Sequence, residues 1–203
     1  MISTDISIKN IIQESEAKAI SYKEYRDLVQ TLVTEGKSTG EEQTEALSNY
    51  TMLNDKRMKR LDKTVKLSEE AISKIKSYNG DVTWLVLTES WCGDAAQTMP
   101  VINKVAELNE NITLKIVLRD ENEALMNEFL TNGGKAIPKL IAIDAPSGNV
   151  IGDWGPRPTK ATQMVNDYKA TYGKLTPEFK KELQVWYNKD KGQNTVEDLL
   201  KLV

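Results

Sequence analysis

The residues best suited to chemistry lie in one segment, TESWCGDA at residues 88–95, which holds the only cysteine of the chain, Cys92. A short apolar run precedes this segment and a helical pattern follows it, so we expect Cys92 at the start of a helix. Free N–H groups and the helix dipole stabilise a thiolate there, lower its pKa and make it a better nucleophile. The competing interpretation is a cysteine packed in the core, which would be inert.

Composition excludes several other chemistries. The sequence has no histidine, which rules out an imidazole base, a histidine-based triad and a histidine metal site. One cysteine cannot form an intrachain disulfide or a cysteine-rich zinc site, so we expect no bound metal and a reducing, cytoplasmic location. With 27 Lys and Arg against 30 Asp and Glu, no global field favours nucleic acid or a membrane surface. We expect neither partner, and the amino-terminal residues do not resemble a signal peptide.

The first 79 residues have helical patterns. Residues 21–24 (SYKE) and 39–42 (TGEE) both read as capping boxes and predict two helix starts. In the second helix we expect an apolar face that includes Tyr50 and Met58, interrupted by Asn54. The opposite face is basic, and a solvated surface is favoured there over a binding surface for an acidic partner or nucleic acid.

From residue 81 the pattern changes to alternating strands and helices. Residues 82–88 form an apolar run typical of a central strand buried on both faces. A helix over 92–109 and a strand over 112–118 complete a β-α-β unit, whose strands we expect to be parallel neighbours. The later predicted elements are, in order, a helix at 121–131, a hairpin of strands at 139–143 and 149–153, and helices at 158–172, from 177 and from 195.

The motif WCGDA at residues 91–95 is followed by Pro100 eight positions after the cysteine, and by Ala-Ile-Pro at 136–138 before a predicted strand. This pattern resembles the thioredoxin-like superfamily. That family has Trp-Cys-Gly-Pro-Cys, a proline that kinks the helix eight residues after the first cysteine, and a cis-proline before its third core strand. The element order over residues 81–173 is also similar.

The resemblance implies an α/β thioredoxin-like fold, with a mixed central sheet flanked by helices. It divides the chain into a helical amino-terminal extension at 1–80, a thioredoxin-like core at 81–175 and carboxyl-terminal helices at 176–203. The sequence leaves open which edge of the sheet the extension packs against.

The resemblance also implies roles for individual residues. Cys92 corresponds to the exposed attacking cysteine, and Trp91 and Gly93 lie beside it. Pro138 corresponds to the cis-proline, and the backbone groups of Ile137 would then bind an extended substrate segment. A trans proline at a strand start is the competing interpretation of Pro138.

Two departures from the family pattern concern the thiol chemistry. Ala95 stands where dithiol members have the second, resolving cysteine, so a mixed disulfide cannot be released within the molecule. Val86 stands where many members have a buried acid, which leaves Glu89 or Asp94 as substitute proton acceptors. Asp94 itself has two possible effects: it can cap the helix start, or its charge can raise the pKa of Cys92.

The predicted hairpin returns the chain to the edge of the sheet that carries Cys92, so we expect residues 154–158 near the thiol. Our hypothesis is that Arg157 offsets the charge of Asp94 or holds an anionic group such as a glutathione carboxylate. Trp154 would then line the groove. An arginine bonded to backbone carbonyls in a rigid loop is an equally good interpretation.

Two functions from different classes follow. In the first, Cys92 attacks protein or small-molecule disulfides, and an external thiol such as glutathione releases the product, with no bound cofactor. In the second, the fold is a binding module that holds an extended peptide in the groove beside Pro138. A third hypothesis is an iron–sulfur cluster bound by one cysteine from each of two subunits. It is weaker, because the sequence lacks the Cys-Gly-Phe-Ser motif of monothiol glutaredoxins. The sequence does not give the oligomeric state.

Overall fold

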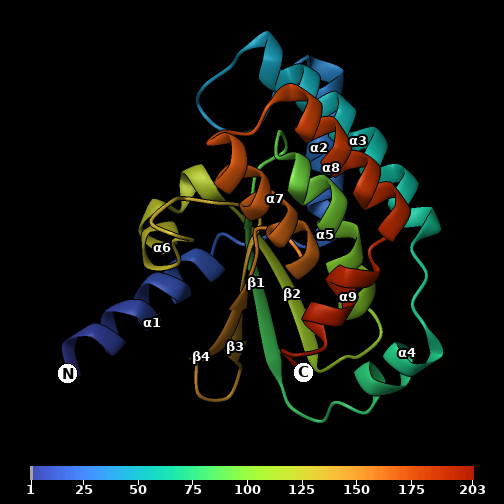
Figure 1. The fold of residues 1–203 in the computed structure, drawn as a ribbon. Coiled ribbons are helices and arrows are strands. Elements are labelled where there is room, and N and C mark those ends of the chain that lie inside the picture. Colours follow the sequence, from blue (N-terminus) through green and yellow to red (C-terminus); the bar gives the residue numbers. More distant parts are fainter. Residues whose placement is uncertain (1) are drawn as a thin grey trace.

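The centre of the molecule is a four-stranded mixed sheet. The computed structural model describes residues 2–203, and their side chains from residue 8 onward. The strands are β1 (Val82–Thr88), β2 (Ile112–Leu118), β3 (Lys139–Asp144) and β4 (Asn149–Trp154), in the order β2-β1-β3-β4. β1 is parallel to β2 and antiparallel to β3, and β4 is antiparallel to β3 (Figure 1).

The predicted β-α-β unit is confirmed. All seven residues of β1 are buried, as its continuous apolar sequence indicates. β1 pairs in register with β2, from Val82 opposite Ile112 to Thr88 opposite Leu118. Helix α5 (Gly93–Ala106) connects them and continues past Pro100, which lies inside it.

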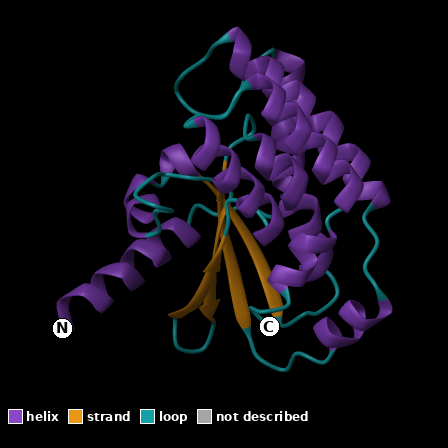
Figure 2. Ribbon diagram, in the orientation of Figure 1, coloured by secondary structure: helices purple, strands orange, loops and turns teal. Residues whose placement is uncertain are grey.

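Helices lie on both sides of the sheet (Figure 2). The predicted α/β class, a mixed sheet flanked by helices, is therefore confirmed. None of the described helices is both long and apolar enough to cross a membrane. The other elements are α1 (Ile2–Glu16), α2 (Tyr22–Glu35), α3 (Glu45–Thr64), α4 (Glu69–Lys76), the 3-10 turn η1 (Arg119–Glu121), α6 (Glu123–Glu128), α7 (Thr159–Tyr172), α8 (Pro177–Asp190) and α9 (Gln193–Leu199).

One of the two predicted helix starts is correct and the other is wrong. Ser21 and Glu24 form a capping box at the start of α2. The second predicted start, at Thr39, is not a helix start, because α3 begins at Glu45 with Thr44 as its N-cap. Thr39 is held elsewhere: its N–H and its hydroxyl both bond the Ser90 hydroxyl, at 2.9 and 3.2 Å.

The inward side of α3 is more polar than predicted. Met58 is buried as expected, but Tyr50 is 51% exposed and Asn54 is fully buried. Asn54 donates its amide hydrogen to the Ser90 carbonyl at 2.9 Å, and the hydroxyls of Thr51 and Ser90 lie 2.8 Å apart. The first half of α3 therefore packs on the loop after β1 through hydrogen bonds. Helix α3 thus packs at the edge of the sheet that carries Cys92, whereas α4 lies at the opposite edge, where Asn109 donates to the Ile75 carbonyl (Figure 1).

The buried apolar residues fall into two groups. A large core joins the strands to α5, α9 and the amino-terminal helices, from Ile12 to Leu199. A small separate cluster lies between α7 and α8, and consists of Ala161, Val165, Phe179, Leu183 and Tyr187. The division of the chain at residue 80 stays a prediction.

We expect Ser90→Ala to lower the free energy of unfolding by about 1–3 kcal/mol, because Thr39 and Thr51 would lose a buried hydrogen-bond partner. Urea unfolding measures this change. The matched control is Ser48→Ala, whose hydroxyl bonds only the nearby Glu45 carbonyl on the surface; its effect should stay within about 0.5 kcal/mol. Equal effects of the two substitutions would contradict this role for Ser90.

Candidate functional site

Cys92 lies where the start of α5 meets the loop before β3. It is the N-cap of α5, and its sulfur accepts a hydrogen bond from the Ala95 N–H at 3.5 Å. The thiol donates its own hydrogen to the Ile137 carbonyl, 3.2 Å away. The residue is 8% exposed. The predicted placement at a helix start is therefore confirmed, but the sulfur is largely shielded.

The sequence left open whether the helix start lowers the thiol pKa or burial and Asp94 raise it, and in the structure the pKa is raised. Burial raises the pKa of the Cys92 thiol to about 12, and the charge of Asp94 adds to this effect. The N–H groups of Ala95 and Asp94, and the charge of Arg157, lower the pKa but do not compensate. The physical reason is that burial removes the water that would solvate a thiolate, and this loss exceeds the effect of the helix start. At rest, Cys92 is therefore a protonated thiol.

Asp94 forms a buried polar network with two distant residues. Its carboxylate pairs with the Arg157 guanidinium at 2.6 Å and accepts a hydrogen bond from the Tyr187 hydroxyl at 3.0 Å. Burial raises the pKa of Asp94, whereas Arg157 and Tyr187 oppose that shift. Arg157 thus offsets the charge of Asp94, which is the first of the two roles predicted for it.

The loop after β4 returns to the Cys92 edge as its topology predicts, because Trp154 pairs with Leu140 in the register of β3 and β4. Trp154 is buried, and its indole N–H donates to Asp198 of α9 at 3.3 Å. It also lines a cavity of about 400 Å³ together with Arg157. The structure therefore brings Arg157 to the site and ties Trp154 to α9.

The loop with Pro138 contacts the thiol through the Ile137 carbonyl, and Trp91 precedes Cys92 in the chain. The Ile137–Pro138 peptide bond is cis, and both residues are buried. Trp91 is half-buried, and the Arg119 guanidinium lies 4.9 Å from the centroid of its ring, within the range of a cation–π interaction. The aromatic residue beside Cys92 is thereby fixed to the end of β2.

The two candidate proton acceptors both bind other groups. Glu89 is fully buried, and its carboxylate accepts a hydrogen bond from the Asp120 N–H at 2.9 Å. Burial raises the pKa of Glu89. Asp94 is engaged by Arg157 and Tyr187. Among the described residues, neither carboxylate is hydrogen-bonded to the thiol, which donates to Ile137 instead.

Sequence reasoning missed the contribution of α8 to this site. Besides Tyr187, the helix contributes Gln184, whose side-chain oxygen accepts a hydrogen bond from Gln97 of α5 at 2.9 Å. A Cβ atom added to Gly93 would lie 3.9 Å from the Gln184 amide nitrogen and 3.5 Å from the Arg57 guanidinium. The sequence predicts α8 as a helix, but its pattern carries no signal of where that helix packs.

We expect Asp94→Asn to lower the pKa of Cys92 by about one unit or more, since it removes an adjacent anion and leaves Arg157 near the sulfur. The rate of Cys92 alkylation by iodoacetamide at pH 8 should then rise roughly tenfold, because thiolate is the reactive form. The control is Asp167→Asn, an exposed residue of α7 that bonds Gln163. An unchanged pH profile of alkylation would show that the charge of Asp94 does not raise the pKa of Cys92.

Unfolding should also depend on the protonation of Cys92. An unfolded thiol ionises near pH 9, whereas the folded thiol stays protonated to about pH 12. The thiol therefore stabilises the fold below pH 9, and this contribution falls by about 1.4 kcal/mol per pH unit above it. We expect the free energy of unfolding to decline less steeply between pH 9 and 11 in Cys92→Ala than in the wild type, as measured by urea titration. Parallel declines would show that the folded thiol is not held protonated.

Comparisons with known proteins support the fold. Two solved structures share the fold: a protein of unknown function from Pseudomonas aeruginosa, with a TM-score of 0.58, and an HIV epitope scaffold, with a TM-score of 0.57. Each is 17% identical to this chain and covers 90% of it, and the match spans 96% and 97% of their own chains. The comparison with curated proteins found no match.

A family model described as thioredoxin matches residues 40–169, which is more than half of the chain. The match includes the Cys92 motif, the Ile137–Pro138 loop and Arg157. It begins before α3, within the segment that the sequence assigned to the extension, and it ends before α8. The chain therefore belongs to the thioredoxin family.

Proposed function

We propose that the protein is a thiol–disulfide oxidoreductase that acts through the single thiol of Cys92. The observation that carries this proposal is the place of the sulfur. It caps the start of α5 and contacts the Ile137 carbonyl next to the cis peptide bond of Pro138. Membership of the thioredoxin family supports the same chemistry.

The proposed reaction has two exchange steps. The Cys92 sulfur attacks one sulfur of a protein or small-molecule disulfide, the substrate S–S bond breaks, and the thiol proton goes to the departing thiolate. The result is a mixed disulfide on Cys92. Because residue 95 is alanine, an external thiol such as glutathione attacks that mixed disulfide. This second step restores the Cys92 thiol and leaves glutathione joined to the substrate sulfur.

The raised pKa of Cys92 sets a condition on this chemistry. Thiolate is the attacking form, and burial is the largest cause of the raised pKa. The N–H groups of Ala95 and Asp94, and the charge of Arg157, all lower the pKa. These groups are already in place, so a state that admits water to the sulfur would be more reactive. We therefore propose that exchange starts from a more open state, in a cytoplasmic setting where glutathione is available.

The test compares wild type with Cys92→Ser in glutathione-coupled reduction of hydroxyethyl disulfide. We expect the substitution to reduce the rate to the level without protein, because no other thiol exists in the chain. When the wild-type protein is incubated with a cell lysate without reductant, we expect it to form mixed disulfides with lysate proteins, and added glutathione should release them. The Cys92→Ser variant should form no mixed disulfide. Equal reduction rates for the two proteins would reject the proposal.

A binding module is the second candidate, and one observation favours it. The thiol is protonated and buried, and it donates to the Ile137 carbonyl, which is how a structural group behaves. In this function an extended peptide would bind along the loop at Pro138, and the thiol would only support that loop. Equal reduction rates, together with peptide binding that survives Cys92→Ser, would favour this function.

A further inference from the structure

Helix α8 covers the start of α5 and is held there by polar side chains. Three hydrogen bonds join it to α5 and to α3 in the described part of the chain. They are Tyr187 to Asp94 at 3.0 Å, Gln97 to Gln184 at 2.9 Å and Arg60 to Asn188 at 2.6 Å. Water can replace each of these bonds, and the neutral bond between Gln97 and Gln184 is the weakest of the three, because the other two involve a charged group. The hydrogen bonds that hold α8 at the site are therefore contacts that can open and be replaced by bonds to water.

The apolar side of α8 is buried against α7 instead. Its residues Phe179, Leu183 and Tyr187 form the small cluster with Ala161 and Val165, separate from the main core. The ring of Phe179 stacks on Tyr168 of α7, with 4.1 Å between the ring centroids. If α8 left α5 together with α7, this cluster would stay intact.

The pair formed by α7 and α8 is attached to α9 at both ends: the start of α7 is bonded to α9, and the end of α8 leads directly into α9. At the start of α7, the N–H and hydroxyl of Thr159 bond the Asp198 carboxylate, each at 2.7 Å. At the end of α8, Lys191 and Gly192 have positive φ, and a Cβ on Gly192 would lie 2.6 Å from Val101 of α5. Glycine is therefore required there, and the two attachments can act as hinges.

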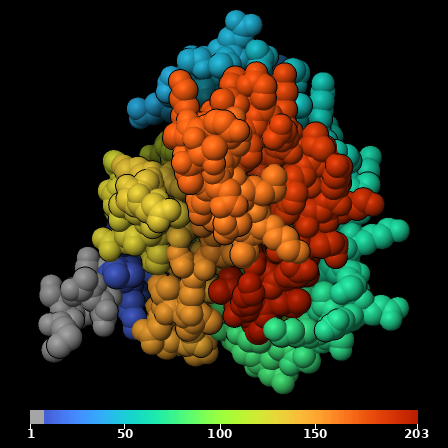
Figure 3. All heavy atoms as spheres, viewed as in Figure 1, coloured from blue at the N-terminus to red at the C-terminus, as the bar shows by residue number. Residues whose placement is uncertain are grey.

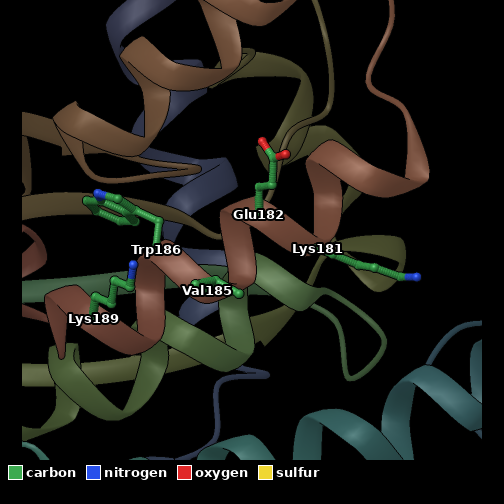
Figure 4. A pocket seen from close by; sticks show the side chains of 5 residues that line it. All are labelled: Lys181, Glu182, Val185, Trp186 and Lys189. Atoms are coloured by element: carbon green, nitrogen blue, oxygen red, sulfur yellow. The ribbon is translucent and has the colours of Figure 1, made fainter.

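The outer side of α8 is open. Lys181, Glu182, Val185, Trp186 and Lys189 line a surface pocket on it (Figure 4). Val185 is 51% exposed, so α8 is held from one side. In Figure 3 the orange and red atoms of the carboxyl-terminal part of the chain cover much of the face shown. The family match ends at residue 169, so α8 is an addition to the matched region.

We propose that residues 161–190, which span most of α7 and all of α8, form a cap over the Cys92 site. The cap opens as a unit by breaking its polar contacts with α3 and α5, and opening gives a disulfide substrate access to the thiol. The role for a substrate rests on the proposed function; the opening itself does not. Tyr187 connects the cap to the site, since its hydroxyl donates to Asp94. Burial raises the pKa of Tyr187, and the neighbouring Asp94 and Cys92 add to this effect.

The test measures the rate of Cys92 alkylation by iodoacetamide at pH 8 in wild type and in Gln184→Ala. Gln184 holds the cap but bonds neither Asp94 nor Cys92, so its loss should favour opening without changing the charges at the sulfur. We expect the rate to rise about 2- to 12-fold, the range given by the loss of one such hydrogen bond. The matched control, Gln163→Ala, removes a surface bond within α7 and should leave the rate unchanged. An unchanged rate in Gln184→Ala would overturn the cap.

Amide hydrogen exchange of the wild type gives a second measurement that needs no variant. We expect the amides of α8 to exchange faster than those of α5, with a weaker dependence on urea than global unfolding shows. Exchange of α8 only through global unfolding would overturn the proposal. Neither alkylation nor amide exchange requires reductase activity. If the cap opens but the protein reduces no disulfide, the proposed function is rejected and the cap is retained.

Discussion

The hydrogen bonds around Ser90 hold the segment on which the site depends. The Ser90 hydroxyl binds Thr39 and Thr51, and its carbonyl accepts from Asn54, so two amino-terminal segments meet at one residue of the loop after β1. That loop leads directly into Cys92 and the start of α5. Helix α3 and the loop before it thereby help to position the thiol, because their residues fix the backbone beside Cys92 from outside the β-α-β unit.

Asp94 in place of a proline changes the electrostatics of the motif. A proline would add no charge, whereas a buried carboxylate loses its hydration and needs partners. Arg157 and Tyr187 supply them, from the loop after β4 and from α8. One substitution therefore links the first turn of α5 to two later parts of the chain. Burial is the main cause of the raised pKa of the neighbouring thiol, and this carboxylate adds to it, so the motif contains a group that opposes ionisation of Cys92.

Local patterns predicted most of the fold, and the errors lie where distant residues decide the outcome. The strands over 82–88 and 112–118 were predicted at their observed bounds, because apolar runs and alternation are local signals. Topology alone placed Arg157 near Asp94. Thr39 was read as a helix cap because its neighbours fit that pattern, yet its actual partner is Ser90. The direction of the Cys92 pKa shift stayed open in the sequence, because the burial of a side chain depends on every element packed around it.

The small core shared by α7 and α8 makes the packing of α8 independent of the main core that positions Cys92. Cys92 and Pro138 lie in the matched thioredoxin region, whereas α8, which we propose covers the thiol, lies outside that region and is stabilised by its own apolar cluster. Substitutions along α8 can therefore alter how the sulfur is shielded while the sheet and the motif keep their structure.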